Sequence, residues 1–346
     1  MPTSSRLLAR KFKESAQSAR SPRAMLNPFS KTCDKIASAR LVRIAELSSE
    51  KPEVHLALIS LPPFDHLSVR LREHTIVQQG SKDEVDKDAS RRLLVDHSQR
   101  ALKNLLEMYE NSLRVSLEEL KADIVCMNEL SFPTRNQEPL KKAVTLTRQL
   151  AKAHNCLIVA GSAHDRRTLY NTSYLFYPGC PPSGEPYHKQ VSATSVGELV
   201  SVPAKRRTIC TRVFGLNIAV LICLDIADFS AVASVVKFQD RVDLLLVPCY
   251  SEYMDSLDRV AKATSAALCG VVALVNYRPP APRAPCIVEE FGETRAVDRD
   301  RVLDSGGIIH SVFIKPPELL ARKLKIKGNP DERMEWLFGP QNVEPR

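Results

Sequence analysis

The sequence has no long apolar run: none of its hydrophobic stretches approaches the roughly 18 residues needed to cross a bilayer. We therefore expect no membrane-spanning segment and no membrane partner. Cys-x-x-Cys pairs and the spacings His-x-His and His-Glu-x-x-His are also absent, which leaves a zinc site without support. The sequence lacks a Gly-x-Ser-x-Gly elbow, a Gly-x-Gly-x-x-Gly loop and a P-loop, so serine hydrolases and nucleotide-binding enzymes are poor candidates.

The composition is that of a globular protein. The chain has 346 residues, of which 44% are hydrophobic and 26% charged, which excludes collagen-like, mucin-like and wholly disordered chains. Its nine cysteines are odd in number and scattered, and several lie in apolar runs. This usage fits a reducing compartment better than a secreted disulfide scaffold, so we expect a cytoplasmic protein.

Positive charge is concentrated at the N-terminus. The net charge is +9, and residues 1–50 hold ten Lys and Arg against four Asp and Glu, whereas residues 51–314 carry a surplus of only one. The central region thus lacks the dense basic patch of a nucleic-acid-binding domain. We expect a basic extension over 1–50, which could dock an acidic partner, a central domain over 51–314, and a polar tail over 315–346.

Apolar segments alternate with amphipathic ones along the central region. Short apolar runs predict buried strands, and leucines spaced by three and four predict helices. The expected strands are 54–61, 123–130, 156–161, 171–177, 214–225, 243–248, 271–276 and 307–314. The expected helices are 102–120, 140–151 and 257–269. This order predicts an α/β layered domain of about 260 residues.

Three residue types in this framework could carry chemistry. Cys223 lies near the end of a predicted strand, where a side chain can face a crevice, and Cys249 occupies a comparable strand end. Most cysteines in apolar strands are inert, and position alone does not choose between these two. Glu129 closes another apolar strand, where burial of a carboxylate is costly unless it is paired or used. Lys189 follows a turn, and a lone lysine is usually a surface residue.

In this order and context, Glu129, Lys189 and Cys223 resemble the nitrilase superfamily of carbon–nitrogen hydrolases. The resemblance extends from about Val54 to about Ile314 and favours Cys223 over Cys249. The matching segments are Glu129-Leu-Ser-x-Pro133, Ala160-Gly-Ser162, Tyr170-Asn-Thr-Ser-Tyr-Leu-Phe176, Tyr187-His-Lys189, Phe214-Gly215, Ile222-Cys-Leu-Asp225, Asp243-Leu-Leu-Leu-Val-Pro248 and Asn276.

The resemblance implies a four-layer α-β-β-α sandwich and a thiol mechanism. Cys223 would attack a carbonyl or nitrile carbon, Glu129 would act as general base, and Lys189 with the N–H of Leu224 would stabilise the negative charge. Glu198 would support the site. The resemblance also implies a small-molecule amide or nitrile substrate, a homo-oligomer and no cofactor, because all reacting groups come from the chain.

The sequence departs from the family at several positions. Asn128 replaces the usual proline before Glu129, residues 226–230 lack the usual Arg and Pro, and the helix over 257–269 lacks a supporting acid or amide. Asp225, in place of the tryptophan of nitrile-cleaving members, favours amide hydrolysis. Two alternatives stay open: a nitrilase-like binding or regulatory module within a larger assembly, and an acyl transferase that uses the same thioester.

Overall fold

Two seven-stranded sheets form the centre of the computed structural model. The structure describes residues 40–47, 50–64, 66–67, 94–95, 99–133, 139–165, 170–191, 207–228, 231–232, 235, 242–251, 254–277 and 286–328. The first sheet has the order β1-β9-β10-β11-β12-β13-β14. These strands are β1 (Arg40–Leu47), β9 (Arg207–Val213), β10 (Leu216–Val220), β11 (Leu244–Cys249), β12 (Val271–Asn276), β13 (Cys286–Glu290) and β14 (Glu293–Arg295).

The second sheet has the order β15-β16-β2-β5-β6-β7-β8. Its strands are β15 (Arg299–Val302), β16 (Ile308–Ile314), β2 (Val54–Ser60), β5 (Ile124–Met127), β6 (Leu157–His164), β7 (Asn171–Phe176) and β8 (Glu185–His188). Central strands β2, β5 and β6 are parallel in this sheet, as are β10, β11 and β12 in the first. A small antiparallel pair, β3 (His66–Leu67) and β4 (Leu94–Val95), is separate.

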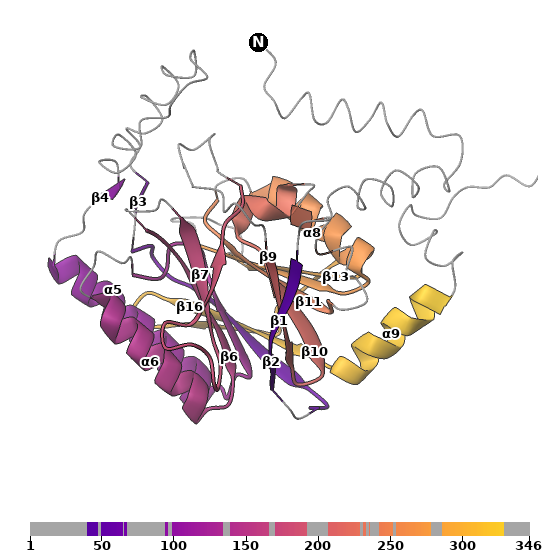
Figure 1. The fold of residues 1–346 in the computed structure, drawn as a ribbon, viewed down its shortest axis with the longest axis horizontal. Helices are drawn as coiled ribbons and strands as arrows, with labels where there is room; N and C mark the ends of the chain where they lie inside the picture. Colours follow the sequence, from indigo (N-terminus) through magenta and orange to yellow (C-terminus); the bar gives the residue numbers. More distant parts are fainter. Residues whose placement is uncertain are drawn as a thin grey trace, which may run out of the picture.

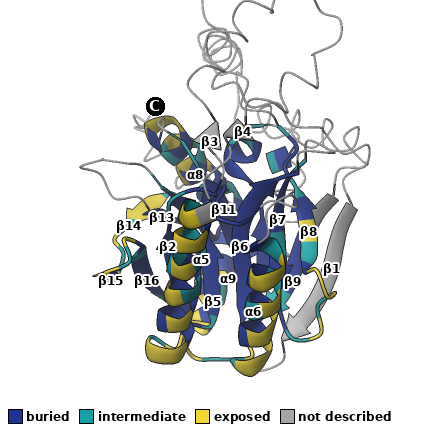
Figure 2. Cartoon of the chain, turned by 90° about the vertical axis from the view of Figure 1, so that its left-hand side faces the viewer, coloured by how far each residue is buried: buried dark blue, intermediate teal, exposed yellow. Residues whose placement is uncertain are grey.

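Helices cover the outer faces of both sheets. The second sheet carries α5 (Gln99–Arg114) and α6 (Pro139–Ala153), and the first carries α8 (Met254–Leu268), as Figure 1 shows. The outward faces of α5 and α6 are exposed, whereas the strands behind them are buried (Figure 2). The result is the four-layer α-β-β-α sandwich that the sequence predicts.

The alternation of side chains along β2 explains the layering. Leu56 and Leu58 point into the core that joins the two sheets, whereas Ala57 and Ile59 belong to the core beneath α5 and α6. Successive side chains of a strand face opposite sides, so a strand that is apolar at every position must be covered on both faces. The continuous apolar runs of the sequence therefore predict central strands between two layers.

Most predicted elements are confirmed, and one strand is wrong. The stretch 214–225 is not a single strand, because Phe214 and Gly215 form the turn between β9 and β10 with φ angles of 51° and 87°. The strand β10 ends at Val220, and a 3-10 helix (Cys223–Ala227) follows. The helix α5 continues from Arg114 into a π-helical turn (Val115–Glu119), within the predicted span 102–120.

Segments at both ends of the sequence contribute elements to the sandwich. Within 1–50, strand β1 pairs in parallel with β9 at the edge of the first sheet, and residues 1–39 lie outside the described residues. Within 315–346, the helix α9 (Pro316–Gly328) buries Leu319 and Ile326 against the core. No helix of the described residues is long and apolar enough to span a membrane.

Candidate active site

The turn after β5 fixes the position of Glu129 between the two sheets. The backbone N–H of Glu129 donates to the carbonyl oxygen of Cys249 at 3.2 Å, which ties the end of β5 to the end of β11. The side chain of Asn128 holds the same turn, since its Oδ1 accepts the N–H of Leu61 at 2.7 Å. Asn128 therefore keeps the turn in place through hydrogen bonds.

A glycine on β6 makes room for this turn. Gly161 has a φ of +74°, and a Cβ added there would lie 2.1 Å from Ser131 Oγ and 2.4 Å from the carbonyl oxygen of Asn128. Neither distance is compatible with a side chain, and the positive φ favours glycine as well. The Ala160-Gly-Ser162 segment of the sequence is thus a packing requirement of the turn that carries Glu129.

The carboxylate of Glu129 is the centre of a buried polar cluster. Its Oε1 accepts hydrogen bonds from Lys189 Nζ at 2.7 Å and from Asn171 Nδ2 at 2.8 Å, and its Oε2 accepts the backbone N–H of Tyr250 at 2.9 Å. The side chain of Glu129 is 3% exposed and that of Lys189 is 1% exposed. The two residues that the sequence singled out on separate segments thus form a direct, buried ion pair.

Lys189 reaches this cluster from the end of β8. Its backbone N–H donates to the carbonyl oxygen of Asn171 at 2.8 Å, so the segment that carries the lysine continues along β7. Asn171 therefore contacts Lys189 through its backbone and Glu129 through its side chain. The sequence analysis quoted Asn171 in a matching segment but gave it no role; an asparagine at the first position of an apolar run was the available signal.

Cys223 occupies a sharp bend at the end of the β10 segment. Its φ is +48°, in the left-handed region that residues with a Cβ rarely adopt, and it is the first residue of the 3-10 helix. Strained backbone of this kind persists where surrounding structure enforces it, and it is concentrated at functional sites. The Cys223 side chain is 3% exposed, so it faces the interior of the sandwich next to the strand ends.

A second thiol lies against Cys223. The Cys249 thiol is in hydrogen-bonding contact with Cys223 and also lies within the electrostatic influence of Glu129 and Lys189. Burial is the main cause that raises the pKa of Cys249 well above its usual value, and the contact with Cys223 adds to it. The two cysteines that the sequence could not separate are therefore neighbours.

Asp225 joins the Lys189 segment to the Cys223 bend. Its Oδ1 accepts the N–H groups of Gln190 and Val191, both at 2.9 Å. Its Oδ2 accepts the Tyr187 hydroxyl at 2.8 Å and the N–H of Ile222 at 3.3 Å. Complete burial raises the pKa of Asp225 to about 7, against the opposing influence of the Lys189 charge.

These bonds give Asp225 a structural task. Its two oxygens hold backbone on both sides of the site, and the residue is fully buried. The Asp225 side chain therefore holds the backbone around the site. It gives no physical reason to prefer an amide substrate over a nitrile substrate.

The end of β12 supports the segment that follows Cys249. Asn276 Oδ1 accepts the N–H of Ser251 at 2.9 Å, and Asn276 Nδ2 donates to the carbonyl oxygen of Ser251 at 3.0 Å. Ser60 at the end of β2 donates to the carbonyl oxygen of Asn276 at 2.7 Å. Asn276 therefore fixes the chain next to Tyr250, whose N–H reaches Glu129, and this explains an asparagine at that strand end.

Leu224 and Glu198 are the two remaining predicted site residues. Leu224 lies in the first turn of the 3-10 helix, directly after Cys223, and is half-buried. Glu198 lies outside the described residues. Within the parts of the chain that are described, no three His, Cys, Asp or Glu side chains gather in a way that could hold a metal ion.

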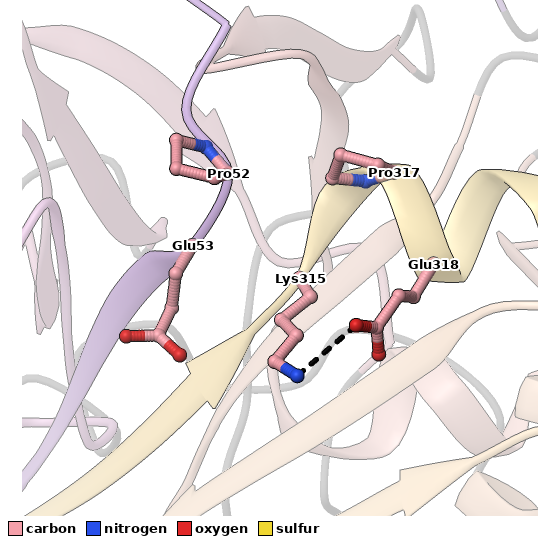
Figure 3. Close-up of a pocket in the computed structure, with 5 residues that line it drawn as sticks. All are labelled: Pro52, Glu53, Lys315, Pro317 and Glu318. Atoms are coloured by element: carbon pink, nitrogen blue, oxygen red, sulfur yellow. Dashed lines mark hydrogen bonds and ion pairs between the residues drawn. The ribbon is translucent and has the colours of Figure 1, made fainter.

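A surface hollow of about 420 Å³ lies apart from this cluster (Figure 3). It is lined by Pro52, Glu53, Lys315, Pro317 and Glu318. Glu53 precedes the first residue of β2, whereas Glu129 follows the last residues of β5, which is parallel to β2. The hollow is therefore at the opposite end of the sheet, and its Lys315–Glu318 ion pair of 3.0 Å is on the exposed surface.

Comparison with solved structures identifies the architecture. No protein-family model and no curated protein matches the sequence. A carbon–nitrogen hydrolase from Helicobacter pylori superposes with a TM-score of 0.53 at 12% identity, over 85% of this chain and 99% of that one.

Two further structures superpose to a similar extent. A CN-hydrolase superfamily protein from Xanthomonas campestris, solved with an arsenic adduct in its active site, gives a TM-score of 0.51, and Nit3 of Saccharomyces cerevisiae, a member of branch 10 of the nitrilase superfamily, gives 0.50. Each is 16% identical and aligns over 81% of this chain and 97% of its own. The chain therefore has the α-β-β-α fold of the nitrilase superfamily of carbon–nitrogen hydrolases.

Proposed function

We propose that the protein is a thiol-dependent hydrolase of non-peptide C–N bonds, of the amidase type, with Cys223 as nucleophile, Glu129 as general base and Lys189 as the stabilising cation. The observation that carries this proposal is the buried ion pair between Glu129 and Lys189, which lies beside a pair of cysteine thiols. The fold supports the same reading, because the solved structures that superpose on it include carbon–nitrogen hydrolases.

The energetics of the ion pair favour a chemical role. Removing two charges from water carries a penalty of several kcal/mol per ion, and a well-packed apolar pair is often at least as stable. Here both charges are almost completely buried, and Asn171 and the N–H of Tyr250 add hydrogen bonds to the carboxylate. Such an arrangement costs desolvation free energy if its role is only structural, but it keeps a base and a cation next to a nucleophile.

The acylation step uses all three side chains. A free thiol has a pKa near 8.5 and only its thiolate is a good nucleophile, so Cys223 needs a base and a nearby positive charge. The Cys223 sulfur attacks the substrate carbonyl carbon while Glu129 accepts the thiol proton. The C–N bond then breaks, Glu129 returns the proton to the departing nitrogen, and ammonia or an amine leaves a thioester on Cys223.

Negative charge on the substrate oxygen is stabilised by two donors. The Lys189 ammonium donates to Glu129 and is a source of positive charge at the site. We assign Lys189, together with the backbone N–H of Leu224 at the start of the 3-10 helix, to the substrate oxygen. Loss of one such donor typically lowers a rate by about a hundredfold to a thousandfold.

Water completes the cycle by releasing the acyl group. Glu129 accepts a proton from the attacking water, the new C–O bond forms, and the C–S bond breaks as Glu129 returns the proton to the departing sulfur, which gives a carboxylic acid and the free thiol. Glu198 is proposed as a positioning group or proton carrier for this half of the reaction. An added amine in place of water would turn the same thioester into an acyl transfer product.

An ammonia-release screen over ω-amides, carbamoyl amino acids and nitriles tests the proposal. We expect release from at least one amide class, and a loss on the order of a thousandfold or more in Cys223→Ala. Cys180→Ala, which changes a half-buried thiol at a turn, is the matched control and should retain full activity. Product analysis with an added amine identifies acyl transfer.

Full activity of Cys223→Ala and Lys189→Ala would contradict the hydrolase proposal. That result would favour a binding or regulatory module, in which the basic segment 1–50 docks an acidic partner. We also propose that the protein forms a homo-oligomer, which sedimentation of the full chain tests directly.

A further inference from the structure

Cys249 is a buried thiol in the site that the proposed reaction does not use. It is the last residue of β11, it is fully buried, and its thiol donates to the carbonyl oxygen of Val247 at 3.3 Å. The same thiol is in hydrogen-bonding contact with Cys223. The site thus contains two adjacent sulfur atoms.

The sheet register explains why these two residues meet. Strands β10 and β11 are parallel, with Val220 opposite Leu246, and the N–H of Leu221 donates to the carbonyl oxygen of Leu246 at 3.1 Å. Three further residues along each chain lead to Cys223 and Cys249. Neighbouring strands lie about 4.7–4.9 Å apart, and disulfides usually join Cα atoms about 4.4–6.8 Å apart. The strand spacing at the Val220–Leu246 pair is therefore within the range that a disulfide joins, and the two chains continue from this pair to Cys223 and Cys249.

The environment distinguishes the two thiols. Burial, the contact with Cys223 and the charge of Glu129 all raise the pKa of Cys249, whereas Lys189 opposes them. Protonation of Cys249 is therefore favoured, and we assign the first reaction with an electrophile to Cys223, the proposed nucleophile at the strained bend.

We propose that the Cys223–Cys249 pair is a site of reversible oxidation, at which a peroxide converts the two thiols into an intramolecular disulfide. In the first step the Cys223 thiolate attacks one peroxide oxygen, the O–O bond breaks, and Cys223 becomes a sulfenic acid while hydroxide leaves as water. In the second step the Cys249 sulfur attacks the sulfenic sulfur, the S–S bond forms, and the S–O bond breaks to release a second water. Two thiols are oxidised, and one peroxide is reduced to two waters.

The second thiol changes the fate of an oxidised nucleophile. A sulfenic acid without a neighbouring thiol proceeds with further peroxide to the sulfinic and sulfonic acids, which common reductants do not reverse. A disulfide with Cys249 stops this sequence, and a dithiol reductant restores both thiols by exchange. The pair would therefore block Cys223 temporarily and protect it from permanent loss.

Peptide mapping of the full chain tests the proposal without any measurement of hydrolysis. Trypsin places Cys223 in the peptide 213–237 and Cys249 in the peptide 242–259, each with one cysteine. After treatment with hydrogen peroxide and alkylation of free thiols, we expect these two peptides to be joined, and dithiothreitol to separate them. The peptides that carry the other described cysteines should be alkylated and unlinked.

Two variants of Cys249 and one control variant complete the experiment. In Cys249→Ser we expect the same peroxide dose to give sulfinic or sulfonic acid at Cys223, which dithiothreitol does not restore to an alkylatable thiol. Cys249→Ala repeats the test with a smaller side chain, and Cys180→Ser, the control, should form the disulfide as the unchanged protein does. A Cys249 that is still alkylated when Cys223 is fully oxidised would overturn the proposal. Because the mapping detects the disulfide and not hydrolysis, its result does not depend on whether the protein shows hydrolase activity.

Discussion

At the scale of single residues, Glu129 explains most of the geometry of the site. Its carboxylate is bonded to a side chain from β7, to the lysine after β8 and to backbone beyond β11, while its own N–H is bonded to Cys249. A strand-end glutamate in the sequence could equally have reached water. Only the hydrogen bonds of the folded chain show that the ends of β5, β8 and β11 meet, so the pairing with Lys189 could not be derived from their positions in the chain.

Replacing the lysine tests how much the pair matters for stability. In Lys189→Met the Glu129 charge stays buried without its cation, so we expect the free energy of unfolding to fall by about 3–5 kcal/mol and hydrolysis to be lost. In the double variant Glu129→Gln with Lys189→Met, no charge stays buried, and most of this stability should return while activity stays lost. Urea unfolding measures both variants, with Lys315→Met as an exposed control. Equal destabilisation in the single and double variants would contradict coupling between the two charges.

The amide of Asn171 gives a second test at this scale. It donates to the same carboxylate oxygen as Lys189, so it orients Glu129 without supplying charge. We expect Asn171→Ala to lower kcat by about tenfold to a hundredfold with little change in KM, because the base is displaced and substrate contacts are kept. Steady-state kinetics check this, and a change confined to KM would place Asn171 in substrate binding instead.

At the scale of elements, the segment around Cys223 shows what sequence patterns miss. The run 214–225 is apolar throughout, and periodicity alone does not indicate that its first two residues form a turn and its last ones a 3-10 helix. The Phe-Gly pair was the available turn signal at the start. At the end, Asp225 accepts the N–H of Ile222 and of the segment after Lys189, and this long-range bonding ends the strand.

The raised pKa of Asp225 predicts a specific pH dependence of stability. Its carboxyl group has an ordinary pKa of 3.8 when exposed and about 7 in the folded protein, because burial disfavours the charge. Because this pKa is higher in the folded than in the unfolded state, the contribution of Asp225 to stability is fully present at low pH. It is lost as the pH rises from about 4 to about 7. The free energy of unfolding of the unchanged protein, relative to Asp225→Asn, should therefore fall over this range and level off above it.

Urea unfolding at several pH values measures that difference directly. Asp228→Asn, which changes a half-buried carboxylate a few residues away, is the control and should show no such trend. A difference that rises with pH would mean that the ionised form is the one the fold prefers, and it would contradict the prediction. The absolute stability of Asp225→Asn should also be lower, because its amide group opposes donors from two segments.

At the scale of the whole molecule, the sequence predicts layers better than edges. The apolar central strands and amphipathic helices predict a layered α/β domain, because each strand must be covered on both faces, and the resemblance to the nitrilase superfamily adds the α-β-β-α order. Edge elements such as β1, β8 and β15 carry a weaker pattern, and β15 is exposed along its whole length. The helix α9 lies in a polar region of sequence, and only its contacts show that Leu319 and Ile326 belong to the core.

The attachment of α9 gives the last prediction. Lys323 Nζ donates to the carbonyl oxygen of Val242 and to Asp243 Oδ1, both at 2.7 Å, with exposures of 5% and 1% for the Lys323 and Asp243 side chains. Asp243 in turn accepts the N–H of Asn217, so one buried carboxylate connects α9 to β10 and β11.

Removal of the Lys323 cation in Lys323→Met leaves the Asp243 charge buried, and we expect the free energy of unfolding to fall by about 3–5 kcal/mol. Lys325→Met on the exposed face of the same helix should change it by less than about 0.5 kcal/mol. Lys323 is bonded just before the start of β11, whereas the candidate site lies at the end of this strand. Lys323→Met should therefore keep the hydrolytic rate of the folded protein at low temperature. A loss of rate without a loss of stability would show that α9 acts on the site rather than on the fold.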